Sequence, residues 1–124
     1  MTLIKNILTF FFAGIIVFAN SAFYPHTQPD VQEYTLKAAF IARFADYIDW
    51  ANEGDNSTFT IGVLGESAIV GPLNDIAKDK KVKNKNIIIK ICKTLDDINS
   101  CQVVFVSKNY TGTVESVAAK ANNR

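Results

Sequence analysis

The stretch Phe59-Thr-Ile-Gly-Val-Leu-Gly65 is a short apolar run with strand composition, and it ends at a glycine. Two further runs of this type follow, residues 86–92 with three successive isoleucines and residues 102–106. The isoleucine-rich run is continuous enough to predict a strand buried on both faces. These predicted strands decide the fold, because the segments between them must return the chain to the start of the next strand.

Helical signals lie between and after the predicted strands. Pro72 suits the first position of a helix that runs toward a group of lysines. Thr94 can cap a short second helix, and Thr111 or Thr113 can cap a third. Strands that alternate with helices predict a parallel sheet with right-handed crossover connections.

Residues 31–50 show helical periodicity with an unusually wide apolar face. One apolar row consists of Tyr34, Ala38, Ile41, Ala45 and Ile48, and a second row beside it consists of Leu36, Phe40, Phe44 and Tyr47. Arg43, Asp46 and Asp49 fall on the opposite side of the helical wheel. The sequence therefore predicts an α/β fold in which an N-terminal helix precedes β-α-β-α-β-α around a parallel, Rossmann-like sheet.

Glu33 and Lys37 fall inside the apolar arc of this helix at i, i+4 spacing, with the acid first. That order favours a salt bridge at the start of the helix, where the arc is still open to solvent. Contact of either side chain with a ligand or a partner at the edge of the sheet is the alternative.

The N-terminus has the composition of a secretory signal peptide. Lys5 precedes an apolar run over residues 7–19, and Ala19 and Ser21 provide the small residues of a cleavage site. The run is shorter than the roughly 20 apolar residues that a membrane anchor needs. The sequence thus predicts a signal peptide over residues 1–22, a linker with two prolines over residues 23–30 and one domain over residues 31–124.

Charge and composition exclude several classes of function. The chain has 13 Lys and Arg against 12 Asp and Glu, which gives no electrostatic case for binding nucleic acid or anionic lipid. The only histidine, His26, lies in the predicted linker, so we expect no metal site, no cofactor and no enzyme. A solvated helix end and turn, rather than a phosphate site, is predicted for the lysine cluster, which consists of Lys78, Lys80, Lys81, Lys83 and Lys85.

Cys92 and Cys101 are the two cysteines of a chain that is expected to be exported. In an oxidising compartment, a disulfide between them is the default expectation. It would close a loop of about ten residues, which is worth roughly 2.5–3 kcal/mol in the chain-entropy model. Two buried thiols are the alternative.

The ends of the predicted strands offer one candidate ligand site. Ligands of open α/β sheets bind beyond the carboxyl ends of the strands, so the expected crevice is marked by Gly65, Glu66, Ser67 and Ser107. Gly62 and Gly65 do not have the spacing of the dinucleotide-binding fingerprint. No cofactor is therefore assigned to this crevice.

Three blocks of sequence carry a resemblance to a known family. They are Glu33-Tyr34-x-Leu36-Lys37-Ala38-Ala39-Phe40-Ile41-x-x-Phe44 with Tyr47 and Trp50, then Phe59-x-Ile61-Gly62-Val63-Leu64-Gly65, and Leu95-Asp96-Asp97-Ile98 leading into Cys101-Gln-Val-Val-Phe-Val-Ser107. In this order they resemble the YfiR family. Ala51 stands where a proline often follows the family's tryptophan. The family domain normally continues past the point of Arg124, so a C-terminally truncated domain with an exposed sheet edge is expected.

The resemblance implies a periplasmic regulatory protein that binds the periplasmic part of an inner-membrane diguanylate cyclase, holds it inactive and so lowers cyclic di-GMP. Some relatives are joined to sensor kinases, so a sensor kinase is a second kind of partner. The alternative function is a periplasmic small-ligand-binding or sensor domain that works with a transporter or a sensor kinase. A homodimer is left open. Tyr47 and Trp50 are candidates for the partner interface, with packing in the core as the alternative.

Overall fold

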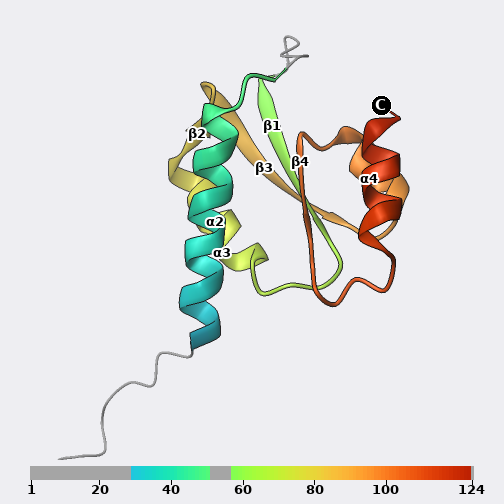
Figure 1. Cartoon of the computed structure of the whole chain (residues 1–124). Helices are drawn as coiled ribbons and strands as arrows, with labels where there is room; N and C mark the ends of the chain where they lie inside the picture. Colours follow the sequence, from blue (N-terminus) through green and yellow to red (C-terminus); the bar gives the residue numbers. More distant parts are fainter. Residues whose placement is uncertain (1–28, 51–56, 124) are drawn as a thin grey trace, which may run out of the picture.

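The computed structural model describes residues 29–50 and 57–123 (Figure 1). Along the chain it contains α2 (Pro29–Tyr47), β1 (Thr58–Leu64), α3 (Val70–Asp79), β2 (Lys81–Val82), β3 (Lys85–Cys92), the 3₁₀ helix η2 (Leu95–Ser100), β4 (Val103–Val106) and α4 (Val114–Asn122). Each predicted strand and helix has a counterpart here, so the α/β prediction is confirmed. The predicted signal peptide, most of the predicted linker and Ala51 lie outside the described residues.

The sheet has four strands in the order β2-β3-β1-β4, and it is mixed. β1 lies between β3 and β4 and is parallel to both, with Ile61 opposite Ile89 on one side and opposite Val103 on the other. β2 pairs antiparallel with β3. The prediction of an all-parallel sheet is therefore wrong by one strand.

The additional strand β2 lies inside the lysine cluster, for which the sequence predicts only a helix end and a turn. Lys83 and Asn84 have positive φ angles of 48° and 62°, so the chain reverses in a two-residue turn. The reversal pairs Val82 with Lys85 and buries Val82, while Lys81 stays exposed. The turn creates this strand without an apolar run, which is why the hydrophobic pattern does not reveal it.

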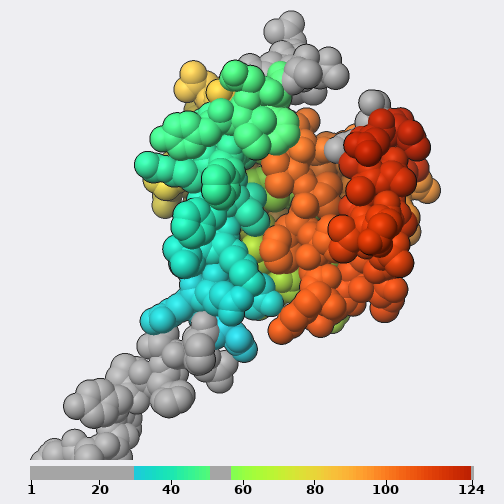
Figure 2. Space-filling view, viewed as in Figure 1, coloured from blue at the N-terminus to red at the C-terminus, as the bar shows by residue number. Residues whose placement is uncertain are grey.

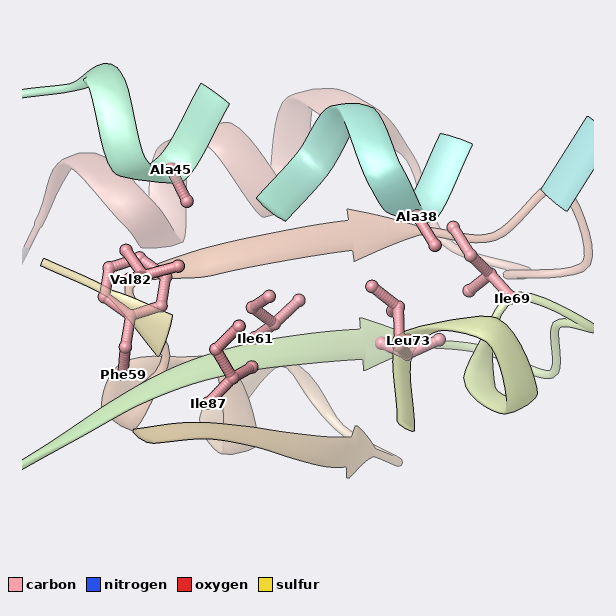
Figure 3. Close-up of a cluster of buried hydrophobic side chains, with 9 residues drawn as sticks. Ala38, Ala45, Phe59, Ile61, Ile69, Leu73, Val82 and Ile87 are labelled. Atoms are coloured by element: carbon pink, nitrogen blue, oxygen red, sulfur yellow. The ribbon is translucent and has the colours of Figure 1, made fainter. Parts of the chain in front are cut away.

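Apolar side chains fill both faces of the sheet. The cluster beneath α2 and α3 consists of Ala38, Ala45, Phe59, Ile61, Val63, Ile69, Leu73, Val82 and Ile87 (Figure 3). The cluster on the other face, toward η2 and α4, consists of Leu64, Cys92, Ile98, Cys101 and Val117. The sheet is thus the middle of three layers, with α2 and α3 on one side and η2 and α4 on the other (Figure 1).

α2 packs on the sheet through small side chains. Its buried positions are alanines, namely Ala38, Ala42 and Ala45, which let the helix lie close to the strands. The second apolar row, Leu36, Phe40, Phe44 and Tyr47, is 52–73% exposed. A helix buries only one stripe of its surface against a sheet, so the sheet covers only part of the wide apolar face that the sequence predicts. The helix has a buried alanine face and a separate exposed row of large apolar side chains.

Two predicted helix starts are confirmed in part. Thr94 and Asp97 form a reciprocal capping box, but the helix that they begin is a 3₁₀ helix and not an α-helix. Of the two threonines proposed to cap the last helix, Thr113 does so, because its Oγ1 accepts the N–H of Ser116 at 3.2 Å. Thr111 lies outside that helix.

Two other predictions are corrected by the structure. α3 begins at Val70, so Pro72 is its third residue, where a missing N–H removes no intrahelical hydrogen bond. β3 is not buried on both faces, because Ile88 and Ile91 are 45% and 61% exposed. The helices on the two sides of the sheet leave these two isoleucines uncovered.

Candidate functional site

A shallow depression of about 580 Å³ lies where β1, β3 and β4 end. Three of the four residues predicted for a crevice line it, namely Gly65, Glu66 and Ser67. Gly65 has a φ angle of 85°, and a Cβ at this position would lie 3.1 Å from the Cβ of Tyr110. The tight turn at Gly65 therefore directs the chain across the carboxyl end of β1, which is where the sequence predicts the crevice.

Ser107, the fourth predicted residue, is buried and does not line the depression. Its hydroxyl donates to the carbonyl oxygen of Glu66, and the amide of Asn109 donates to the Ser107 hydroxyl at 3.1 Å. The side chain of Asn109 also donates to the carbonyl oxygen of Glu66, at 3.2 Å. Ser107 thus fixes the floor of the site, which positions Glu66 and Asn109 above it.

Sequence reasoning missed four residues that line the depression, which are Ala68, Val70, Ile91 and Asn109. Asn109 could have been predicted, because it follows a predicted strand by only a few residues. Ile91 could not, because the strand that contains it was predicted to be buried on both faces. The lining offers one carboxylate, one hydroxyl, one amide and apolar carbon, which suits a small polar ligand. Within residues 29–50 and 57–123, no three His, Cys, Asp or Glu side chains are grouped to hold a metal ion.

Cys92 and Cys101 lie together on the other face of the sheet, with their Sγ atoms 3.9 Å apart. Both side chains are buried. Gly62 lies directly against them, since a Cβ there would be 2.7 Å from the Sγ of Cys101 and 3.1 Å from that of Cys92. An S–S bond of about 2.05 Å needs the two sulfurs to approach by roughly 2 Å. Because Gly62 has no side chain, it leaves space for the two sulfur atoms.

Burial raises the pKa of the Cys92 thiol to about 11, and the nearby Cys101 adds to the increase. The thiolate is the reactive form of cysteine, so a high pKa makes Cys92 a poor nucleophile at neutral pH. The pair therefore has the character of a structural site.

The structure places the two predicted interface aromatics differently. Tyr47 is 73% exposed, and the guanidinium of Arg43 lies 6.0 Å from the centre of its ring. Trp50 is partly buried against the core beneath α2, and its Nε1 donates to the carbonyl oxygen of Ala45 at 2.9 Å. Tyr47 is available to a partner, and Trp50 contributes to packing.

Tyr47 belongs to the exposed row Leu36, Phe40, Phe44 and Tyr47, which we name the outer row of α2. Phe40 and Phe44 stack with ring centroids 6.0 Å apart. At the start of the same helix, Glu33 and Lys37 form the predicted salt bridge, which is exposed. The hydrogen bond from Lys37 lowers the pKa of Glu33. An exposed apolar row of this length is typical of a surface that contacts another molecule.

The chain is a small α/β domain with two exposed features, a shallow depression at the strand ends and the outer row of α2. Residues 34–124 match the YfiR/HmsC-like family, and the chain belongs to that family. No curated protein and no solved structure matches the chain. In the part of the chain that the structure describes, no helix has the length and apolar content needed to cross a membrane.

Proposed function

We propose that this protein is a periplasmic regulatory binding protein that holds an inner-membrane diguanylate cyclase inactive and so lowers cyclic di-GMP. Residues 1–22 act as the signal peptide that exports it, and residues 31–124 act as the binding domain. The protein is not an enzyme in this proposal. A sensor kinase is the alternative partner in this proposal.

The outer row of α2 is the observation that carries this proposal. It presents large side chains to solvent on a helix whose buried face is already filled by alanines, so the row is not needed to hold the helix to the sheet. Aromatic and large aliphatic side chains are the usual anchors of protein interfaces. Leu36 and Tyr47 point most directly away from the sheet, because they lie about half a turn from Ala38 and Ala45 on the helical wheel. We assign them to the cyclase contact.

Substitution of the outer row tests this assignment. Leu36→Glu and Tyr47→Glu should each weaken binding to the purified periplasmic part of the cyclase by about 30-fold or more, because a charge replaces an apolar anchor. Cellular cyclic di-GMP should rise in strains that carry either variant. Ile88→Glu is the matched control, since Ile88 is 45% exposed on another element and should be neutral in both assays. A folded Leu36→Glu protein that binds and represses like the parent would overturn the assignment.

The depression at the strand ends favours a second candidate function, a small-ligand-binding or sensor domain that works with a transporter or a sensor kinase. Glu66 and Asn109 are exposed and face a common hollow, so they can contact a polar ligand directly. Native mass spectrometry of protein purified from the periplasm should then show a bound small molecule. Glu66→Ala should lose that molecule while the fold is kept. Parent protein that carries no added mass would count against this function.

A further inference from the structure

A groove of about 330 Å³, which we name the α2–α3 groove, lies between α2 and the segment that runs from the end of α3 into β2. The surface of that segment, in yellow, borders α2 on the side away from β4 (Figure 2). Ala39 and Ala42 of α2 and Ile76 of α3 provide the apolar part of the lining. The alanine side chains are short, so they leave a hollow that a longer side chain would fill.

Three cationic side chains line the same groove. Lys80 directly follows α3, Lys81 begins β2, and Arg43 comes from α2, which the fold places beside them. In the part of the chain that the structure describes, no carboxylate forms an ion pair with any of the three. Their charges are therefore available to a ligand in the groove.

Asp46 contributes the one carboxylate of the lining, and this carboxylate already has a partner. Its Oδ1 accepts the backbone N–H of Lys83 at 2.9 Å, which holds the turn after β2 against α2. The Nζ of Lys83 lies 3.6 Å from the carboxylate of Asp49. Three cationic groups against one anionic group give the lining a formal charge of +2.

The position of the lysines has a simpler explanation, which does not extend to Arg43. Cationic side chains are favoured at the carboxyl end of a helix, where Lys78 and Lys80 lie, and Lys78 also pairs with Asp75 at 2.8 Å. Arg43 lies before the last turn of α2, so the helix dipole does not account for it. The sequence predicts only a solvated helix end and turn here, because local patterns do not show that α2 brings an arginine to the lysines.

We propose that the α2–α3 groove binds a phosphate monoester, with the phosphate between Arg43, Lys80 and Lys81 and the carbon part of the ligand against the alanines of α2. A phosphate monoester presents three acceptor oxygens and close to two negative charges at neutral pH. It can therefore accept a hydrogen bond from each cation and balance the formal charge of the lining. A carboxylate presents two oxygens and one charge, so it matches the groove less well.

Isothermal titration calorimetry of the purified protein with glycerol phosphate at low ionic strength tests the site. The parent should bind this probe, and Arg43→Gln and Lys80→Gln should each weaken binding by about 10-fold or more, because each removes a charge-assisted hydrogen bond. Lys78→Gln is the matched control. It removes the same charge from the same end of α3 but lies outside the groove, so binding should change by less than about 2-fold.

Ala39→Leu tests the shape of the groove independently of its charge. Ala39 is exposed on α2, so the substitution should leave the fold intact while the longer side chain fills the hollow. Binding of glycerol phosphate should then be lost although every cation is kept. Unchanged binding by Ala39→Leu would overturn the proposal, and so would an equal loss of binding in Lys78→Gln and Lys80→Gln. Either result would mean that the lysines attract anions without forming a site.

A phosphate monoester can belong to a soluble metabolite or to the head group of a lipid, and vesicles distinguish these sources. Vesicles of phosphatidylcholine that contain phosphatidic acid should recruit the parent and not Lys80→Gln if the ligand is a lipid. Binding of glycerol phosphate without recruitment to these vesicles indicates a soluble ligand. A parent that binds neither probe would overturn the proposal.

The proposed site does not depend on the proposed cyclase contact. Arg43 lies beside the ring of Tyr47, which belongs to that contact, but Lys80 comes from the other side of the groove. Lys80→Gln should therefore lose glycerol phosphate and still bind the cyclase like the parent. The two proposals can thus fail separately.

Discussion

The indole of Trp50 lies edge-on against the ring of Phe59, with ring centroids 5.3 Å apart and an interplanar angle of 64°. This contact joins the segment directly after α2 to β1, and the hydrogen bond from Nε1 to the carbonyl oxygen of Ala45 fixes the orientation of the indole. Aromatic pairs in this geometry stabilise a fold beyond the area that they bury.

Trp50→Ala should therefore lower the free energy of unfolding by about 2–4 kcal/mol, because it removes the ring contact and leaves a cavity over Phe59. Tyr47→Ala is the matched control and should change it by less than about 0.5 kcal/mol, since Tyr47 is exposed. Urea denaturation of both variants measures the difference. Equal stability of Trp50→Ala and the parent would show that the indole is not a packing residue.

We propose that Cys92 and Cys101 form a disulfide, because their Sγ atoms are already 3.9 Å apart and the periplasm, where we propose that the protein acts, is an oxidising compartment. The bond closes a short loop across η2 and should raise the free energy of unfolding by roughly 2.5–3 kcal/mol. Mass spectrometry of non-reduced periplasmic protein should show two hydrogens fewer than after reduction. Full alkylation of both cysteines without prior reduction would contradict the proposal.

In the reduced protein, the raised pKa of Cys92 predicts a loss of stability at high pH. The folded pKa of about 11 lies above the ordinary thiol value of 9.0, so folding favours the neutral thiol. The stabilisation is complete below about pH 9 and is lost as the pH rises toward 11. Denaturation of reduced parent and Cys92→Ser across this range isolates the effect. Parallel pH profiles of the two proteins would show that Cys92 does not cause it.

Gly62→Ala should destabilise the fold, because its Cβ would be 2.7 Å from the Sγ of Cys101. Overpacking of this kind typically costs about 1–3 kcal/mol. The matched control is Gly71→Ala in the first turn of α3, where nothing lies within 4 Å of an added Cβ. Thermal unfolding should separate the two variants clearly. A Gly62→Ala protein as stable as Gly71→Ala would mean that the sulfur pair moves aside at no cost.

The three long strands could be predicted because each is a short apolar run between turn-forming residues. The same pattern could not show which apolar residues of α2 face the core. Ala38 and Phe40 are both apolar, yet close packing on the sheet selects the alanine and leaves the phenylalanine exposed. That choice depends on how closely the helix approaches the strands, which a helical wheel does not contain.

The candidate site was predictable where it follows from the rule for parallel strands, as with Gly65, Glu66 and Ser67. Ser107 follows the same rule but is buried, because its hydroxyl is used by the carbonyl oxygen of Glu66, far away in the chain. Hydrogen bonds between distant segments leave no mark on local periodicity. For this reason the sequence could predict which strand ends border the depression but not which side chains line it.

The β2 edge of the sheet is protected against the addition of another strand. β2 presents exposed Lys81 beside the turn at Lys83 and Asn84. Lysines along an edge strand oppose pairing with a further strand. The two-residue turn that creates β2 therefore also covers the edge of β3, which would otherwise present an isoleucine-rich strand to other chains.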